Sequence, residues 1–154
     1  MITIRNYKDS DAQALRSIHF NTIHTINTRD YSKEQVDAWA PASFDKAFWA
    51  KRFKGLSPFV AQINGTIVGY TDLQNNGLID HFFCHHEYQG KGIGRKLMTH
   101  VLNLAKERGI KRLYSEVSIT ARPFYEHFGF HVEKEQVFEI RGQMLKNFVM
   151  EKFI

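Results

Sequence analysis

The spacing of apolar residues along the chain changes near residue 59. Before that point apolar side chains recur every three or four positions, which predicts a helix over 10–26. The capping box of Ser32–Gln35 then predicts a short helix that Pro41 ends, and the aromatic positions of 44–53 predict a third helix. The isoleucines at positions 2 and 4 predict a strand ahead of these helices.

After residue 59 the pattern favours strands. The segments 59–63 and 66–73 flank Asn64-Gly65, which predicts a hairpin, and 78–84 reads as a third strand. A helix is expected at 92–108, a strand at 113–117, a short helix at 120–127, and strands at 130–140 and 144–153. This order predicts an α+β fold. No repeat or linker interrupts it, so residues 1–154 are expected to form one domain.

The composition narrows the class of protein. Of 154 residues, 43% are apolar and 24% charged, with no long uncharged apolar run, which excludes a membrane span and a disordered chain. Thirteen Phe, six Tyr and two Trp predict an aromatic core or pocket. The single Cys84 allows no internal disulfide and the first residues lack the apolar segment of a signal peptide, so we expect a cytoplasmic protein.

The formal net charge of +5 suggests an anionic partner. Basic residues are otherwise scattered, and Lys91, Arg95 and Lys96 form the one compact set inside a motif. The charge alone does not choose between a nucleic acid, a membrane surface and a phosphorylated cofactor.

That motif is the segment 89–96, Gln-Gly-Lys-Gly-Ile-Gly-Arg-Lys, which follows a predicted strand and runs into the start of a predicted helix. Glycines let backbone N–H groups approach phosphate oxygens, and a helix N-terminus adds positive charge, so the segment can bind a diphosphate. It lacks the third glycine of a dinucleotide fingerprint and the Gly-Lys-Ser/Thr of a P-loop. The alternative is a tight strand-to-helix connection without a ligand.

The chain resembles the GNAT superfamily of N-acetyltransferases. Gln89-Gly-Lys-Gly92-Ile-Gly94 matches the family's pyrophosphate motif, the segment from Ala121 to Phe130 matches its Ala-x-x-x-Tyr…Gly-Phe segment, and the order of elements agrees. The run 24–31 with Trp39-Ala-Pro41 also resembles a bacterial subgroup, the YafP-type acetyltransferases. The resemblance implies a mixed, mostly antiparallel central sheet of about seven strands flanked by helices.

The same resemblance implies a site for acetyl-CoA between splayed strands four and five. Pantetheine would pair with the backbone of strand four, and the diphosphate would bind the amides of 89–94. Ser118 stands where the family often has Asn, so the resemblance leaves two alternatives for the side-chain contact to pantetheine or a nearby turn: a weaker contact, or one supplied by Thr120. The implied cofactor residues are Phe82, Phe83, Cys84, Gln89, Gly90, Lys91, Gly92, Ile93, Gly94, Arg95 and Ser118.

Two residues are expected to carry the chemistry. Tyr125 aligns with the family tyrosine that protonates the departing thiolate, although a tyrosine on a short helix can also be a packing residue. Glu116 is the first candidate for the base that takes the amine proton, against the alternative of a structural strand residue. Asp80 and His81 are the next candidates.

The acceptor is expected to be a small-molecule or peptide amine under an aromatic lid. Substrate-binding candidates are His24, Tyr31, Trp39 and Asp80, with Asn27, Phe44 and Trp49 in the same segments. Core packing explains most of these residues equally well. Few acids accompany them, which favours a small, partly apolar amine over a polycation.

No metal is expected. If His81 and His85 share a strand face they stand roughly 13 Å apart, too far to bind one ion together, and Cys84 is expected to be a small buried residue. The resemblance thus implies an acetyl-CoA-dependent N-acetyltransferase that works by direct attack in a ternary complex, and we expect a monomer or homodimer without a membrane partner. The alternative is a non-catalytic module of the same fold that binds an anionic partner such as nucleic acid.

Overall fold

The computed structural model describes the whole chain, residues 1–154, as twelve helices and strands with three short 3-10 turns. The strands follow the predicted hairpins, and the helices begin and end within a few residues of their capping signals. In chain order the elements are β1 (Ile2–Asn6), α1 (Ala12–Thr25), α2 (Lys33–Trp39), α3 (Lys46–Leu56), β2 (Phe59–Ile63), β3 (Thr66–Thr71), β4 (Phe82–Cys84), α4 (Ile93–Glu107), β5 (Arg112–Ser118), α5 (Arg122–His127), β6 (His131–Ile140) and β7 (Gln143–Phe153).

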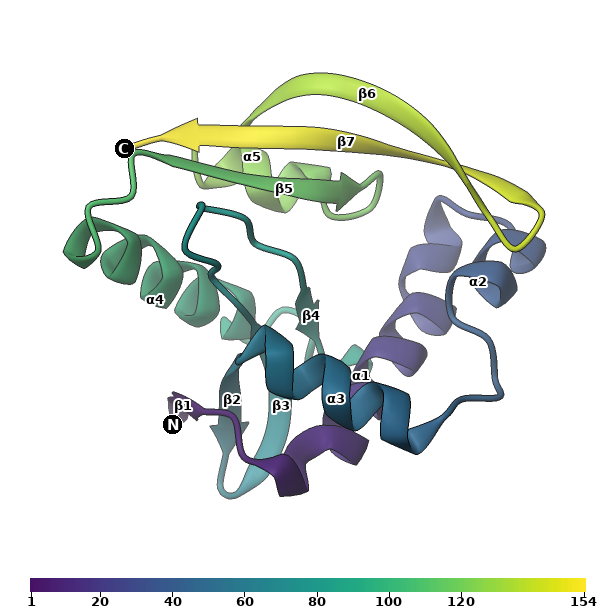
Figure 1. The fold of residues 1–154 in the computed structure, drawn as a ribbon, viewed down its shortest axis with the longest axis horizontal. Coiled ribbons are helices and arrows are strands. Elements are labelled where there is room, and N and C mark those ends of the chain that lie inside the picture. Colours follow the sequence, from purple (N-terminus) through teal and green to yellow (C-terminus); the bar gives the residue numbers. More distant parts are fainter.

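The seven strands form two sheets rather than one. The first sheet has the antiparallel order β1-β2-β3-β4, and the second has the order β5-β7-β6, also antiparallel (Figure 1). A single parallel bridge between Leu78 and Tyr114 joins them. Past that bridge β4 and β5 have no ladder between them, so each strand keeps an unpaired edge facing the opening.

Strand β4 is shorter than the sequence predicts, because it covers 82–84 instead of 78–84. The carboxylate of Asp72 accepts the backbone N–H of Asp80 at 3.1 Å and that of His81 at 2.6 Å, so these amides are not available to a ladder. Residues 77–79 bond to Tyr114 of the second sheet instead. A buried side chain therefore breaks the strand where the apolar pattern continues.

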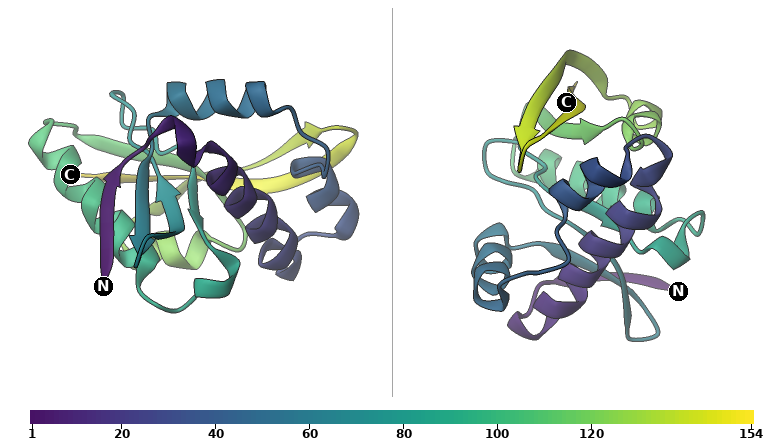
Figure 2. Two further views of the ribbon diagram at one scale, coloured as in Figure 1. Left: turned by 90° about the horizontal axis from the view of Figure 1, so that it is seen from below. Right: turned by 90° about the vertical axis from the view of Figure 1, so that its right-hand side faces the viewer.

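Helices cover the first sheet on both faces. Ile93 and Leu97 of α4 pack against Ala61 and Val68 on one face. On the other face α1 and α3 bury Leu15, Ile18, Phe53 and Leu56 against Val60 and Tyr70. Figure 2 shows α4 on one side of this sheet and α1 and α3 on the other. The apolar face that the sequence predicts for α4 is the face that packs against the sheet.

The second sheet is anchored at its two ends. Its largest core joins Tyr125, Phe130, Phe148 and Met150 to α4. At the other end Leu145 packs with Ile23, Tyr31 and Val36 of the α1–α2 region. The two anchors hold the sheets apart, and the opening between them is the main cavity.

None of the helices is both long and apolar enough to cross a membrane.

Candidate active site

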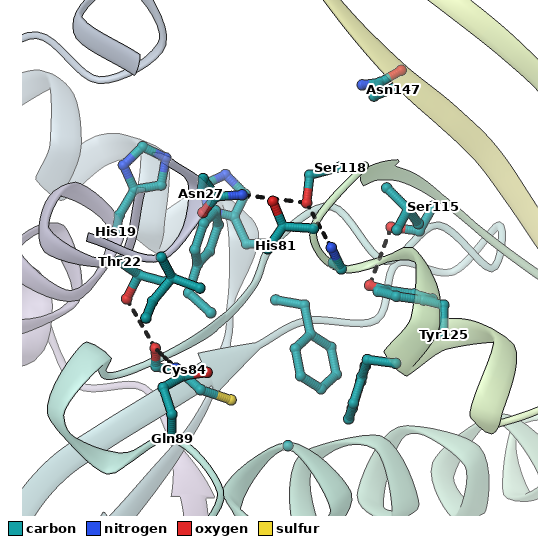
Figure 3. A pocket seen from close by; sticks show the side chains of 18 of the residues that line it. His19, Thr22, Asn27, His81, Cys84, Gln89, Ser115, Ser118, Tyr125 and Asn147 are labelled. Carbon is teal, nitrogen blue, oxygen red and sulfur yellow. Dashed lines mark hydrogen bonds between the residues drawn. The ribbon is translucent and has the colours of Figure 1, made fainter. Parts of the chain in front are cut away.

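A cavity of about 770 Å³ occupies the opening between the two sheets. It is continuous from the glycine turn before α4, past β4 and β5, to the inner side of α1 and the β6–β7 hairpin. Figure 3 shows part of its lining, with side chains from both halves of the molecule. A ligand there would contact segments that lie more than 100 positions apart in the sequence.

The end at α4 offers backbone donors. Gly92 is the N-cap residue of α4, at φ +83°, and no side chain caps the helix. The first amides of the helix therefore have no partner in the protein and face an anion-binding position. A Cβ on Gly92 would meet nothing within 4 Å, so the space over the turn is open, whereas one on Gly94 would lie 2.9 Å from the ring of Phe124.

The free edge of β4 borders the middle of the cavity. Residues 82–84 pair with β3 on one side only. The carbonyl of Cys84 is fixed because it accepts the hydroxyl of Thr22 at 2.8 Å and the amide of Gln89 at 3.0 Å. The remaining edge can take an extended chain of amides, as sheet edges do when they bind peptides.

Tyr125 reaches this region from α5. Its hydroxyl lies 3.4 Å from the Oγ of Ser115, which itself donates to the carbonyl of Ile79 at 2.7 Å, so the phenol donates to Ser115 (Figure 3). Burial raises the pKa of Tyr125, and it raises the pKa of the Cys84 thiol to about 12. A thiolate formed in this dry part of the cavity would be strongly basic for the same reason, and the phenol stays protonated beside it.

The inner end of the cavity contains two neutral histidines. His19 of α1 and His81 stack with ring centroids 5.6 Å apart, next to Phe83. Burial lowers the pKa of His19 to about 3 and that of His81 to about 4, so both rings are uncharged at neutral pH. The Tyr70 hydroxyl holds Nδ1 of His81 at 2.9 Å. Uncharged imidazoles with pKa values this low are weak proton acceptors, which disfavours His81 as the base.

Charged side chains of the cavity differ in whether they are paired. Asp80 lines the cavity but forms an ion pair with Arg52. Glu116 is exposed within the lining of the cavity, and one of its oxygens accepts the amide of Gln136 at 3.0 Å. Arg29 lines the cavity and has no carboxylate partner. Of the two carboxylates in the lining, Asp80 and Glu116, only Glu116 forms no ion pair.

The structure places most of the expected cofactor residues along this cavity and leaves Lys91 outside it. The lining includes 82–84, Gln89, Gly90, Gly92, Ile93, Gly94, Arg95 and Ser118, whereas the side chain of Lys91 is exposed. Arg95 packs over Phe128 and lies 3.4 Å from the imidazole of His127. Ser118 accepts the amides of Asn27 and Ala121, so its hydroxyl organises the start of α5. Thr120 lines the cavity too, with a buried hydroxyl that has no partner.

Fewer than half of the acceptor residues proposed from the sequence line the cavity. Trp39, Asp80 and Asn27 line the cavity, and the other four do not. His24 donates to the carbonyl of Ala40 at 2.7 Å. The hydroxyl of Tyr31 accepts the N–H of Ile119 and donates to the carbonyl of Lys146, which ties the turn before α2 to the second sheet. These two side chains are structural, because their polar atoms are already bonded away from the cavity.

Phe44 and Trp49 are the other two acceptor candidates outside the cavity. Phe44 is 40% exposed and packs under the guanidinium of Arg16, and Trp49 packs on Phe53 and His19. An apolar helix pattern cannot separate a ring that lines a cavity from one that packs behind it, since both occupy the same face.

Several residues that line the cavity were not among the site residues proposed from the sequence. His19, Thr22, Arg29, Ser115 and Asn147 all line the cavity. The period of α1 does predict that His19 and Thr22 face inward, and a polar residue on an apolar face was the available sign. Asn147 lies opposite Ser118 on β7, and its Oδ1 is buried without a partner. That pairing depends on strand register and cannot be read from one strand.

The histidines whose ligand atoms lie close together are His85 and His86, not the pair of His81 and His85 considered from the sequence. The ligand atoms of His85, His86 and Glu87 lie within 4.8 Å of one another. The rings of His85 and His86 stack at an interplanar angle of 10°, so their in-plane lone pairs run side by side rather than toward one point. This arrangement does not fit the convergent geometry of a transition-metal site.

Comparisons with known proteins agree with this geometry. Residues 27–152 match the family model described as an acetyltransferase (GNAT) domain. The chain is 33% identical over 149 residues to the uncharacterized N-acetyltransferase YafP of Escherichia coli, covering 97% of this chain and 94% of that one. A GCN5-related N-acetyltransferase structure from Rhodopseudomonas palustris superposes with a TM-score of 0.93 at 31% identity, over 99% of this chain and 95% of that chain.

A more distant structure shows the same fold with a ligand. The PaiA N-acetyltransferase of Thermoplasma acidophilum, solved in complex with coenzyme A, has a TM-score of 0.77 at 21% identity, over 100% of this chain and 99% of that chain. The split sheet, the uncapped glycine turn before α4 and the extent of these matches lead to one conclusion. The chain belongs to the GNAT family of N-acetyltransferases, and it is similar to YafP.

Proposed function

We propose that this protein transfers the acetyl group of acetyl-CoA to the amine of a small molecule or peptide by direct attack in a ternary complex. The observation that carries the proposal is the single cavity that joins the glycine turn, the free edge of β4 and Tyr125 to an acceptor end. Both substrates would lie along one continuous opening, so the transfer would need no covalent enzyme intermediate.

The cofactor part of the cavity supports acetyl-CoA. The amides at the start of α4 would hold the diphosphate, with Arg95 at the rim, and the edge of 82–84 would pair with pantetheine. Acetyl-CoA would be bound mainly by backbone groups, with Arg95 at the edge of the cavity, so its affinity would depend on the shape of the glycine turn before α4. Lys91 contributes at most long-range attraction, since its side chain lies outside the lining.

Two side chains would move the protons. The amine nitrogen attacks the thioester carbon, and the C–S bond breaks as the acetyl group moves to nitrogen. Tyr125 would donate its proton to the departing sulfur, and Glu116 would take the ammonium proton through water. Burial supports the first role because the phenol remains protonated, and the exposed, unpaired carboxylate of Glu116 supports the second.

Relatives with named acceptors leave two substrate classes to consider. The spermine/spermidine N(1)-acetyltransferase of Bacillus subtilis is 33% identical over 88 residues, 53% of this chain and 58% of that one. The L-methionine sulfoximine/L-methionine sulfone acetyltransferase of Salmonella typhimurium is 27% identical over 120 residues, 70% of this chain and 66% of that one. Polyamines and amino-acid derivatives are thus the first acceptors to test.

A direct experiment tests the function. Acetyl-CoA affinity would be measured by calorimetry, and free-thiol release would be followed with a panel of amines. We expect acetyl-CoA binding and amine-dependent thiol release. Acetyl-CoA binding without release for any amine would favour a non-catalytic module of this fold, and a salt-sensitive gel shift with nucleic acid would then test the anionic-partner alternative.

A further inference from the structure

His81 is held by three consecutive residues, Tyr70 and Thr71 at the end of β3 and Asp72 directly after it. The Tyr70 hydroxyl lies 2.9 Å from the imidazole Nδ1, the Thr71 hydroxyl donates to the His81 carbonyl at 2.8 Å, and the Asp72 carboxylate accepts its N–H at 2.6 Å. These contacts involve each polar atom of the residue except Nε2. The side chain lines the cavity, so Nε2 is its one polar atom left for a ligand.

The Tyr70 contact determines which ring nitrogen carries the proton. Tyr70 is fully buried, and its hydroxyl has no hydrogen-bond partner other than Nδ1. If Nδ1 carried the hydrogen and donated it, the buried phenol O–H would have no acceptor, which is costly. The phenol therefore donates to Nδ1. A neutral imidazole has one ring hydrogen, so that hydrogen is on Nε2.

We propose that His81, oriented by Tyr70, is a specificity-determining donor whose Nε2–H binds an oxygen of the acceptor, so that the enzyme prefers amines that also carry a carboxylate. This inference rests on the proposed acetyl transfer and names the acceptor class of the same site. A polyamine offers only ammonium and amine groups, and it would leave this N–H without a partner in a partly buried position.

The charges at this end of the cavity favour the same class. Asp80 is paired with Arg52, and His19 and His81 are neutral. Glu116 is then left as the single unpaired carboxylate of the lining, enough for the reacting amine but not for further ammonium groups. An acceptor with one amine and one carboxylate matches this inventory, because its amine has Glu116 and its carboxylate has the His81 donor.

The tautomer is tested without any reaction. Nitrogen-15 NMR of histidine-labelled protein at pH 7 reports which ring nitrogen is protonated, and the His81 signals are assigned by their loss in His81→Gln. We expect a neutral ring with hydrogen on Nε2, and a shift toward a mixture of tautomers in Tyr70→Phe. A ring protonated on Nδ1, or a charged ring, would overturn the assignment.

The acceptor class is tested with matched amines that differ in the carboxylate, such as L-phenylalanine against phenethylamine and L-methionine against 3-(methylthio)propylamine, with spermidine as a third type. We expect the carboxylated member to have a kcat/KM higher by roughly 10-fold or more, mainly through KM, since hydrogen bonds to charged groups have about this effect. His81→Leu and Tyr70→Phe should bring the ratio toward one. His81→Gln should keep part of it.

His131→Gln serves as the control, because His131 is exposed and bonds to Glu151 far from the cavity. Its ratio should equal that of the wild type. Thiol release with equal use of both members of each pair, or a ratio unchanged in His81→Leu, would overturn the inference while the acetyltransferase function stands. Failure of every amine to release thiol would overturn the function itself and the acceptor class with it.

Discussion

The carboxylate of Asp72 accepts the backbone N–H of His81 at 2.6 Å, from a position with no solvent exposure. The same carboxylate accepts the N–H of Asp80 and the side-chain amide of Gln74. It therefore keeps residues 80 and 81 out of β4, close to the point where the sheets separate, and it fixes the backbone of His81, whose ring is held by Tyr70. Burial raises the pKa of Asp72 to about 6, more than these hydrogen bonds lower it.

This raised pKa predicts a pH-dependent stability. Between about pH 4 and pH 6 the folded state holds a proton on Asp72 that the unfolded chain has released, so stability falls as pH rises through this window and levels off above it. Relative to Asp72→Asn, the wild type should lose roughly 2–3 kcal/mol of unfolding free energy across the window. Urea titrations of both proteins from pH 4 to 8 check this, and a pH-independent difference would contradict it.

Gly92→Val should weaken acetyl-CoA binding while the fold persists. The side chain would enter the open space over the turn, where the diphosphate is proposed to lie, and φ +83° adds backbone strain of roughly 1–2 kcal/mol. Gly65→Val is a matched control, because Gly65 has φ +81° and open space but lies in the β2–β3 turn. Calorimetry should show a large loss of affinity in the first variant and none in the second. Equal affinities would remove the turn from the cofactor site.

Tyr125→Phe should lower kcat by roughly 10²- to 10⁴-fold and leave acetyl-CoA affinity nearly unchanged. The ring and its packing on Phe130 remain, and the lost hydrogen bond to Ser115 is long at 3.4 Å, so melting should change little. Single-turnover kinetics under saturating acetyl-CoA measure the chemical step. A rate within about twofold of the wild type would mean that water or another group protonates the sulfur.

Glu116→Gln should reduce kcat/KM most at low pH, where few acceptor molecules are already neutral. The acceptor amine, with a pKa near about 10 if it resembles lysine, loses its proton unaided as pH rises, so high pH should partly rescue the variant. Glu133→Gln, on the exposed part of β6, is the control. Profiles from pH 6 to 10 that run parallel to the wild type would assign Glu116 a structural role.

Local sequence patterns predicted most of the elements and most of the residues that line the cavity at its proposed cofactor end. The α4 helix, its preceding glycine turn and the strand before it are contiguous, so short-range periodicity and turn chemistry carry the information. The resemblance to GNAT enzymes rests on the same stretch and on the Tyr125 segment. Lys91 is the exception, since spacing alone does not say on which side of a turn a side chain lies.

The acceptor end was decided by tertiary structure. The short length of β4 depends on Asp72, a buried carboxylate that looks like an ordinary strand-end residue in the sequence. His24 and Tyr31 lie close in the sequence to residues that line the cavity, and only packing shows that their polar atoms are bonded elsewhere.

By itself, then, the sequence determined the helices, the hairpins, the family and the glycine turn, because each depends on residues close together in the chain. The separation of the sheets, the orientation of His81 by Tyr70 and the meeting of Asn147 with Ser118 were decided only in the folded molecule. These features depend on contacts between distant segments, and the free energy of burying a polar group depends on the partners that those segments bring to it.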